Sequence, residues 1–243
     1  KTFIFISMDV LFIGDKLRKE VISALKIQKT VHKNFPDENI VFSATHNHHA
    51  PACDDEKPGL GIFDTRFYIQ IKLATINLIK RVMLSKFINA TIEYSDFETE
   101  NLIINRRRKV WSGLRLRKEM KTYPNPSAYK YEKIHFLKFL DEKDNLKGLI
   151  WNFGCHTLTH YTRSRVSSDF PGFIRKKVRQ KFKNKNFTIL FFQGFSGNIV
   201  PKKYNYSWKR YHPADLLNRI IYGPSFGKFS KNMQTEWMKK LSN

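Results

Sequence analysis

The stretch 41-VFSATHNHHAP-51 joins an apolar run to a cluster of three histidines. Its β-branched and aromatic first half predicts a buried strand over residues 41–45, and Pro51 closes the turn that follows. Side chains two positions apart in an extended segment point the same way, so His46 and His48 are expected to share one site. Because imidazole is a common zinc ligand, the stretch predicts a metal site. The simpler alternative is a polar loop with solvated histidines.

The segments before this stretch complete a βαβ unit. Residues 2–10 form an apolar strand that ends near Asp9, and residues 15–31 carry apolar side chains at helical spacing. A strand, a helix and a strand in this order imply parallel pairing. Functional side chains gather at the carboxyl ends of parallel strands, so Asp9 and His46 are expected at one edge. The predicted fold class is α/β: a mixed, largely parallel β-sheet flanked by helices, with a metal site at the strand C-terminal ends.

The rest of the chain repeats this design. Residues 134–140 and 148–153 are apolar strands around a polar turn, which predicts a hairpin. The second of these strands leads to His156, as the earlier strand leads to His46. The polar, basic segment 113–130 is predicted to be irregular. The remaining predicted elements are strands over 89–96 and 187–193 and helices over 65–84, from Ser168 or Asp169 onward, over 213–221 and over 235–241.

Charge is the strongest feature of the composition. The 44 Lys and Arg against 21 Asp and Glu give a net charge of +23, which favours anionic partners such as acidic glycans or an anionic membrane surface. Specific nucleic-acid binding is not expected, because no recognition motif accompanies the charge. The basic run over residues 105–109 is typical of a solvated face. Alternatively, one of its arginines turns inward to hold a carboxylate or a carbonyl oxygen.

Length and cysteine count set further limits. A chain of 243 residues with 41% hydrophobic residues has a globular composition and suits one large domain or two small ones. Cys53 and Cys155 are predicted to be free, partly buried thiols; a single bridge or a ligand role is the alternative. No apolar stretch is long enough to span a membrane, and no signal peptide precedes the first strand. A strand directly at Lys1 suggests that upstream sequence lies outside this chain. The oligomeric state is not predicted.

Polar segments at strand ends follow one another in a recognisable order. They are Ser7-Met8-Asp9, Ala44 to Pro51, Ile104-Asn105-Arg106, Asn152 to Thr157, Ser167-Ser168-Asp169 and Gly194 to Pro201. This order resembles the neutral/alkaline ceramidase family, zinc amidases that hydrolyse N-acylsphingosine. The family shows V-S-x-D, T-H-T-H-S-x-P, I-N-R, a strand ending in H-P, S-x-D and G-D-x-S-P. The resemblance spans residues 2–201. It implies a single ceramidase-like α/β domain over residues 1–243, with 202–243 as a basic, aromatic C-terminal extension.

The resemblance implies a role for several of these residues. His46 and His156 would be zinc ligands, His48 would lie beside the metal-bound water, and Arg106 would face the substrate. In the family a Glu and a Tyr downstream complete the zinc sphere, and here Asp9 is expected as a replacement third ligand.

The last motif departs from the family pattern. Asn198 occupies the place of the hexapeptide aspartate, and Val200 occupies that of its serine. A valine can neither act as a nucleophile nor hydrogen-bond a substrate, so ceramide itself is not the expected substrate. Ser196 lies four residues early and cannot take over the role.

These expectations combine into one function. The chain is predicted to be a zinc-dependent hydrolase of an amide or ester bond in an anionic N-acyl or O-acyl lipid or glycan, with metal-bound water as the nucleophile. His48 would accept a proton, and Arg106 with the amides around Asn198 would stabilise the oxyanion. The alternative is a catalytically inactive ceramidase-like domain that binds an anionic polymer or a membrane surface. The resemblance implies a secreted or cell-envelope location.

Overall fold

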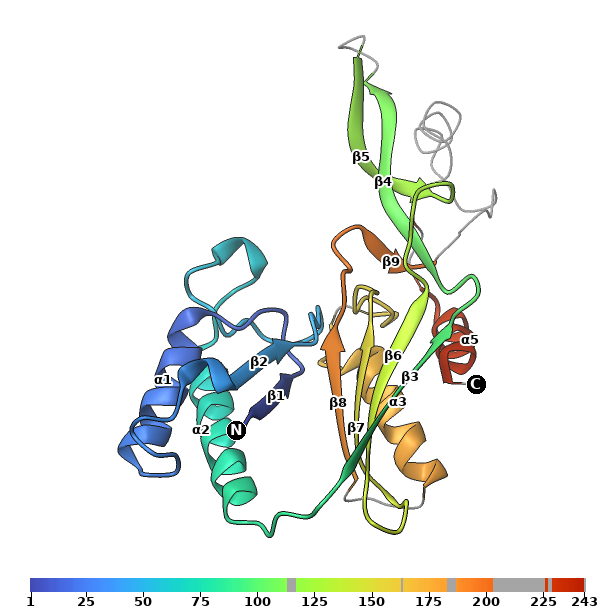
Figure 1. Ribbon diagram of the computed structural model, residues 1–243. Helices are drawn as coiled ribbons and strands as arrows, with labels where there is room; N and C mark the ends of the chain where they lie inside the picture. The colour runs from blue at the N-terminus through green and yellow to red at the C-terminus, as the bar shows by residue number, and fades with distance from the viewer. Residues whose placement is uncertain (113–116, 163, 183–186, 203–225, 227–228, 243) are drawn as a thin grey trace.

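The computed structural model describes residues 1–112, 117–162, 164–182, 187–202, 226 and 229–242, which form two lobes and a projecting hairpin (Figure 1). The smaller lobe contains the N-terminal third of the chain. Its elements are β1 (Ile4–Met8), α1 (Asp15–Ile27), η1 (Asp37–Asn39), β2 (Ile40–Ala44), η2 (Pro58–Leu60) and α2 (Thr65–Met83). The predicted βαβ unit is confirmed, because β1 pairs with β2 in parallel. Apolar side chains at helical spacing in α1, among them Leu17, Val21 and Leu25, form the core of this lobe.

The larger lobe is built on a four-stranded sheet in the order β3-β6-β7-β8. Its strands are β3 (Thr91–Glu98), β6 (Lys133–Leu140), β7 (Leu146–Phe153) and β8 (Thr188–Gln193). The hairpin predicted over residues 134–153 is confirmed as β6 and β7. Helices α3 (Asp169–Lys181) and α5 (Lys231–Ser242) contribute Phe170 and Trp237 to a core that also contains Trp151, Phe153 and Phe191.

A third, three-stranded sheet has the order β5-β4-β9. Its strands are β4 (Ile103–Ser112), β5 (Arg117–Asn125) and β9 (Ile199–Pro201). The β4–β5 hairpin extends beyond the body of the molecule (Figure 1). The prediction of irregular structure over residues 113–130 is therefore wrong for β5. Its pattern was missed because polar and basic residues occupy an exposed two-stranded arm, where no apolar alternation is needed.

The predicted largely parallel sheet is also wrong. Of the strand pairs in the described part of the chain, β1–β2 and β7–β8 are parallel, whereas β3–β6, β6–β7, β4–β5 and β4–β9 are antiparallel. The protein is mixed α/β with several small, mostly antiparallel sheets. Exposed strands such as β3 explain the difference, because antiparallel sheets tolerate one solvated face and parallel sheets rarely do.

Two helices were predicted near the C-terminus, and the structure describes one of them. The helix predicted over 213–221 lies outside the described residues. The helix predicted over 235–241 lies within α5, whose Trp237 Nε1 donates a hydrogen bond to the Leu102 carbonyl oxygen at 2.7 Å.

Cys53 and Cys155 are both buried and form no disulfide with each other. Within the described ranges, no helix is long and apolar enough to cross a bilayer.

Candidate metal centre

His46 and His48 of the opening stretch come together with His156 where the two lobes meet. His46 follows β2, and His156 follows β7. His46 has a left-handed backbone (φ 57°), so the strand ends before it and the chain turns. The idea that an extended segment places His46 and His48 together is therefore wrong in its geometry, although the turn does bring their ring centroids to 4.9 Å.

The imidazoles of His46, His48 and His156 form one cluster. One ligand nitrogen from each ring lies within 4.8 Å of the other two, and the Nε2 atoms of His46 and His156 are 3.2 Å apart. Ligand nitrogens around a tetrahedral zinc ion with bonds of ~2.1 Å are separated by about 3.4 Å. The cluster can therefore hold a metal ion.

Backbone carbonyls orient two of the three rings. His46 Nδ1 lies 3.2 Å from the Leu11 oxygen, and His156 Nδ1 lies 2.6 Å from the Ser196 oxygen. A carbonyl oxygen only accepts, so we assign the proton of each neutral ring to Nδ1. Both Nε2 atoms then present lone pairs to each other at 3.2 Å. A metal-binding histidine usually donates its second ring N–H to a carbonyl oxygen in this way. A cation between the two Nε2 atoms would remove the repulsion between their lone pairs.

The electrostatics of the cluster favour neutral imidazole. Burial, followed by the positive charge of Arg106, lowers the pKa of His156 to about 4. Burial and repulsion from His46 lower the pKa of His48 to about 3, although part of His48 is exposed at the mouth of the site. Burial also lowers the pKa of His46. All three rings are thus neutral at pH 7, in the form that binds metal.

Arg106 faces the cluster. Its Nη2 donates to the Gly197 oxygen at 2.8 Å and lies 3.2 Å from His156 Nε2. Burial lowers the pKa of this guanidinium. Both interpretations of the basic run are thus correct for different residues, because Arg106 turns inward while Arg107 and Lys109 are exposed. A metal ion at His156 Nε2 would take the place of the Arg106 hydrogen bond.

Asp9 lies apart from the three-histidine group. Its carboxylate accepts two hydrogen bonds from Arg175, at 3.1 and 3.3 Å, and the backbone oxygen of Asp9 accepts from Asn47 Nδ2. The structure does not bring this predicted third ligand into the cluster.

The turn between β8 and β9 carries the residues of the hexapeptide. Val200 is buried in β9, where it pairs with Ile104 and is 5% exposed. Asn198 is exposed, and its Oδ1 accepts from Arg107 Nε at 3.3 Å. Of the amides expected at an oxyanion, that of Ile199 already donates to the Ser196 oxygen.

Two residues that sequence reasoning did not assign to the site hold its loops in place. Asn47 Nδ2 donates to the Ser167 oxygen at 2.6 Å, which ties the histidine turn to the loop before α3. Asp169, recognised only as part of a motif and a helix start, is fully buried and accepts from the amides of Thr159, His160 and Phe170. It also lies 3.7 Å from His49 Nε2. The signal available in the sequence for Asp169 was a carboxylate in the Ser167-Ser168-Asp169 motif at the start of a predicted helix, whereas nothing in the sequence singled out Asn47.

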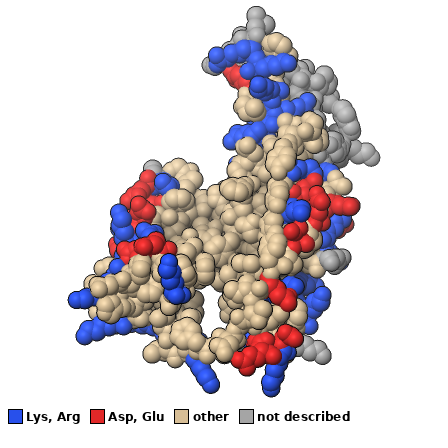
Figure 2. Space-filling model, viewed as in Figure 1, with Lys and Arg blue, Asp and Glu red and all other residues tan. Residues whose placement is uncertain are grey.

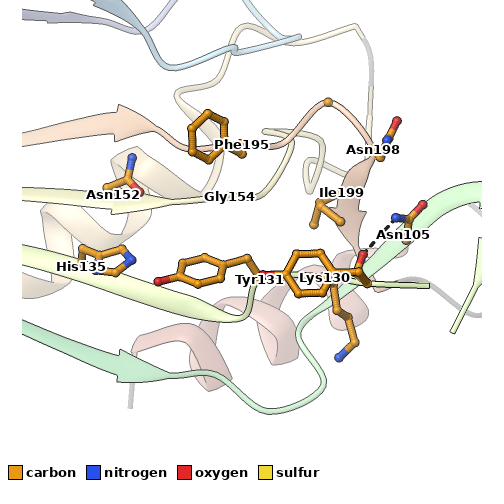
Figure 3. A pocket seen from close by; sticks show the side chains of 11 residues that line it. Asn105, Lys130, Tyr131, His135, Asn152, Gly154, Phe195, Asn198 and Ile199 are labelled. Atoms are coloured by element: carbon orange, nitrogen blue, oxygen red, sulfur yellow. Dashed lines mark hydrogen bonds between the residues drawn. The ribbon is translucent and has the colours of Figure 1, made fainter. Parts of the chain in front are cut away.

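A pocket of about 870 Å³ adjoins the cluster. Its lining includes Phe195, Tyr131, His135 and Asn198, which are drawn in Figure 3. The Tyr131 and His135 rings stack with their centroids 5.6 Å apart. Gly197 and Ile199 also line it, and their carbonyl oxygens bond Arg106 and His156. One short turn therefore forms both the pocket wall and the support of the candidate metal centre.

The fold and the site define a mixed α/β protein with a three-histidine candidate metal centre. Residues 1–205 match the family profile described as neutral/alkaline non-lysosomal ceramidase, N-terminal. Because this match covers most of the chain, the chain belongs to the neutral/alkaline ceramidase family. The resemblance seen in the sequence motifs is confirmed.

Two solved structures show the same fold. The crystal structure of neutral ceramidase from Pseudomonas aeruginosa is 19% identical with a TM-score of 0.69, and the match covers 97% of this chain and 35% of that one. A ceramidase complexed with C2 is 20% identical with a TM-score of 0.67, covering 97% and 34%. The chain thus spans about one third of the length of these structures. The comparison with curated proteins found no match.

Proposed function

We propose that this chain carries the metal-binding part of a zinc-dependent hydrolase that cleaves an amide or ester bond in an N-acyl or O-acyl substrate. The observation that carries the proposal is the 3.2 Å approach of the His46 and His156 Nε2 atoms, each on a ring whose Nδ1 is held by a backbone carbonyl. Zinc, when bound, supplies Lewis acidity that activates water and polarises a carbonyl. Membership of a ceramidase family supports a lipid substrate.

His46 and His156 are the proposed ligands, and His48 is the proposed proton acceptor. We separate these roles because backbone carbonyls orient only the first two rings. Among the described residues, no hydrogen bond to the His48 ring is found. The His48 ring lies beside that of His46, with the two centroids 4.9 Å apart, and it is neutral at pH 7, so it can accept a proton.

Arg106 and the turn at Asn198 are the proposed oxyanion stabilisers. Arg106 Nη2 already bonds the Gly197 oxygen beside the cluster, so a developing negative charge there would meet a fixed positive group. Asn198 belongs to this turn and also lines the pocket. Neither role requires a serine at position 200.

The adjoining pocket supports an acylated substrate. Its aromatic lining by Phe195 and Tyr131 suits an acyl chain, while Lys130 and Asn105 supply polar groups at its edge (Figure 3). The net charge of +23 further favours an anionic head group. The proposed substrate is therefore an acylated lipid or glycan in general, and ceramide is not singled out.

A panel of amides and esters tests the hydrolase directly. The purified protein, loaded with one equivalent of zinc, is assayed against ceramide, short-chain N-acyl amines, acyl esters and N-acetylated sugars. We expect turnover of at least one acylated class, lost in His156→Ala and kept in His32→Ala, since His32 is exposed and outside the cluster. Stoichiometric zinc without turnover of any class would contradict the hydrolase.

A second function is favoured by Val200. The buried valine at the place of the family serine is what a chain without catalysis would carry. In that case the domain binds an anionic polymer or a membrane surface through its positive charge. Steeply salt-dependent binding to such a surface, together with absence of bound metal, would support this second function over the first.

A further inference from the structure

The projecting β4–β5 hairpin has two chemically different faces. Residues opposite each other in an antiparallel pair point to the same side, and the register pairs Arg107 with Thr122, Lys109 with Met120 and Trp111 with Lys118. One face therefore consists of these six residues, which we call the basic arm face. All six are exposed, whereas Val110, on the opposite face, is buried.

Among the described residues, no acidic side chain forms an ion pair with the cations of the basic arm face. It contains Arg107, Lys109 and Lys118, and the one acidic residue in the sequences of β4 and β5, Glu119, lies on the opposite face and pairs with Arg117. Figure 2 shows Lys and Arg gathered on this arm. The arm therefore presents a local positive potential to any surface that approaches it.

Two large apolar side chains lie among these cations. Trp111 is 57% exposed and Met120 is 53% exposed. Lys118 Nζ lies over the Trp111 ring, 5.5 Å from its centroid. Tryptophan flanked by Lys and Arg is the combination that favours the lipid–water interface, because the ring enters the head-group region while the cations meet anionic lipids. A polyanion such as nucleic acid would use the charges but has no need of the exposed methionine.

We propose that the basic arm face docks this protein onto a bilayer surface containing anionic lipids. The arm stands clear of the body, so a flat surface can reach it (Figures 1 and 2). Its base adjoins the pocket, since Arg107 Nε donates to Asn198 Oδ1 and Asn198 lines that pocket. Docking would thereby hold the pocket near the lipid that it is proposed to take.

This inference extends the proposed function, but its test uses neither metal nor turnover. Zinc-free protein is mixed with vesicles of phosphatidylcholine alone, or with one fifth phosphatidylserine, and the bound fraction is measured by flotation. The charge variant is Lys109→Ala with Lys118→Ala. The matched control is Lys33→Ala with Lys86→Ala, which removes the same charge from exposed positions of the smaller lobe and its linker. Unfolding curves verify that each variant is folded.

We expect the parent protein to bind the anionic vesicles and not the vesicles of phosphatidylcholine alone. The partition coefficient of the charge variant should be about 25-fold lower, since each basic side chain near such a surface contributes about fivefold to partitioning. The control pair should stay within about threefold of the parent, because its charges lie away from the arm. Brominated lipid should quench tryptophan fluorescence of the parent protein and not that of Trp111→Phe.

Three results would overturn the proposal. Equal losses in the charge variant and the control pair would mean that only net charge matters. Equal binding of heparin or RNA, with no effect of Trp111→Ser on vesicle binding, would mean that the arm recognises polyanions. Absence of binding to either vesicle would exclude docking while leaving the metal-dependent hydrolysis to its own assay.

Discussion

The Nε2 atoms of His46 and His156 lie 3.2 Å apart, although 110 residues separate the two histidines in the sequence. They meet because the lobes are joined beside them: Thr157 Oγ1 donates to the Thr45 oxygen at 2.6 Å, and Ser7 Oγ donates to the Phe191 oxygen at 2.6 Å. The candidate metal centre is therefore a property of the interface between the lobes.

The His48→Ala variant tests whether His48 is a zinc ligand or the proton acceptor. We expect His48→Ala to keep one equivalent of zinc and to lose about 10²- to 10⁴-fold in turnover, the usual contribution of a positioned proton acceptor. Isothermal titration with zinc and the hydrolysis assay measure the two effects. Loss of zinc from this variant would make His48 a ligand and contradict its assignment as the base.

Replacing Asp9 tests whether this carboxylate reaches the metal. Because Arg175 holds both carboxylate oxygens, we expect Asp9→Asn to leave zinc affinity within about twofold of the parent. The measurement is the same zinc titration. A drop of about tenfold or more, of the size expected when a ligand or its close support is lost, would restore Asp9 as the third ligand.

Arg106 is expected to control the protonation of His156. Burial, followed by the positive charge of Arg106, lowers the pKa of that imidazole to about 4, so Arg106→Gln should raise the His156 pKa by part of this shift. Titration of the ring proton signals in the zinc-free protein measures the shift, and Lys109→Gln, an exposed cation on the opposite face of β4, serves as the control. An unchanged His156 pKa would show that Arg106 does not act on the ring.

The stability of the zinc-free protein should depend on pH through His156. This buried ring has a pKa of about 4 when folded and about 6.5 when unfolded, so the unfolded chain binds more protons between these values. The free energy of unfolding should therefore be fully present above pH 6.5. As the pH falls from 6.5 toward 4, it should decrease by up to about 1.4 kcal/mol per pH unit.

Urea unfolding at pH 7, 5.5 and 4.5 measures this dependence. We expect a shallower slope in His156→Gln, which cannot gain the proton, and an unchanged slope in His32→Gln. Identical slopes in all three proteins would contradict the role of burial at His156.

Restoring the family serine should destabilise the chain without activating it. Val200 is buried in β9, so Val200→Ser places a hydroxyl in an apolar site at a cost of about 1–3 kcal/mol. Turnover should stay within a fewfold of the parent, because the proposed reaction uses water. A rise of tenfold or more would show that the reaction proceeds through a serine.

The sequence predicted the elements whose burial leaves a periodic pattern. The β1–α1–β2 unit and the β6–β7 hairpin were predicted because apolar residues recur with the period of a strand or a helix. The convergence of His46 and His156 followed from their places after apolar strands and from the family motifs. No such pattern marks β5, where exposed basic residues alternate with half-buried ones.

Tertiary contacts decided what the sequence could not. Asp9 follows a strand like a ligand, but Arg175, 166 residues away in sequence, holds its carboxylate. The contact between Arg106 and His156 also depends on the turn after β8, because the Gly197 and Ser196 oxygens of that turn bond the two side chains. No local sequence pattern specifies this contact. Similarly, the predominance of antiparallel pairs could not follow from one βαβ unit.

X-ray absorption at the zinc edge tests the central claim most directly. Purified protein supplied with one equivalent of zinc should show at least two imidazole nitrogens at about 2.0–2.1 Å. That signal should disappear in His46→Ala and in His156→Ala and persist in His32→Ala. Zinc that binds without imidazole ligands, or that binds equally well in all four proteins, would contradict a metal centre built on His46 and His156.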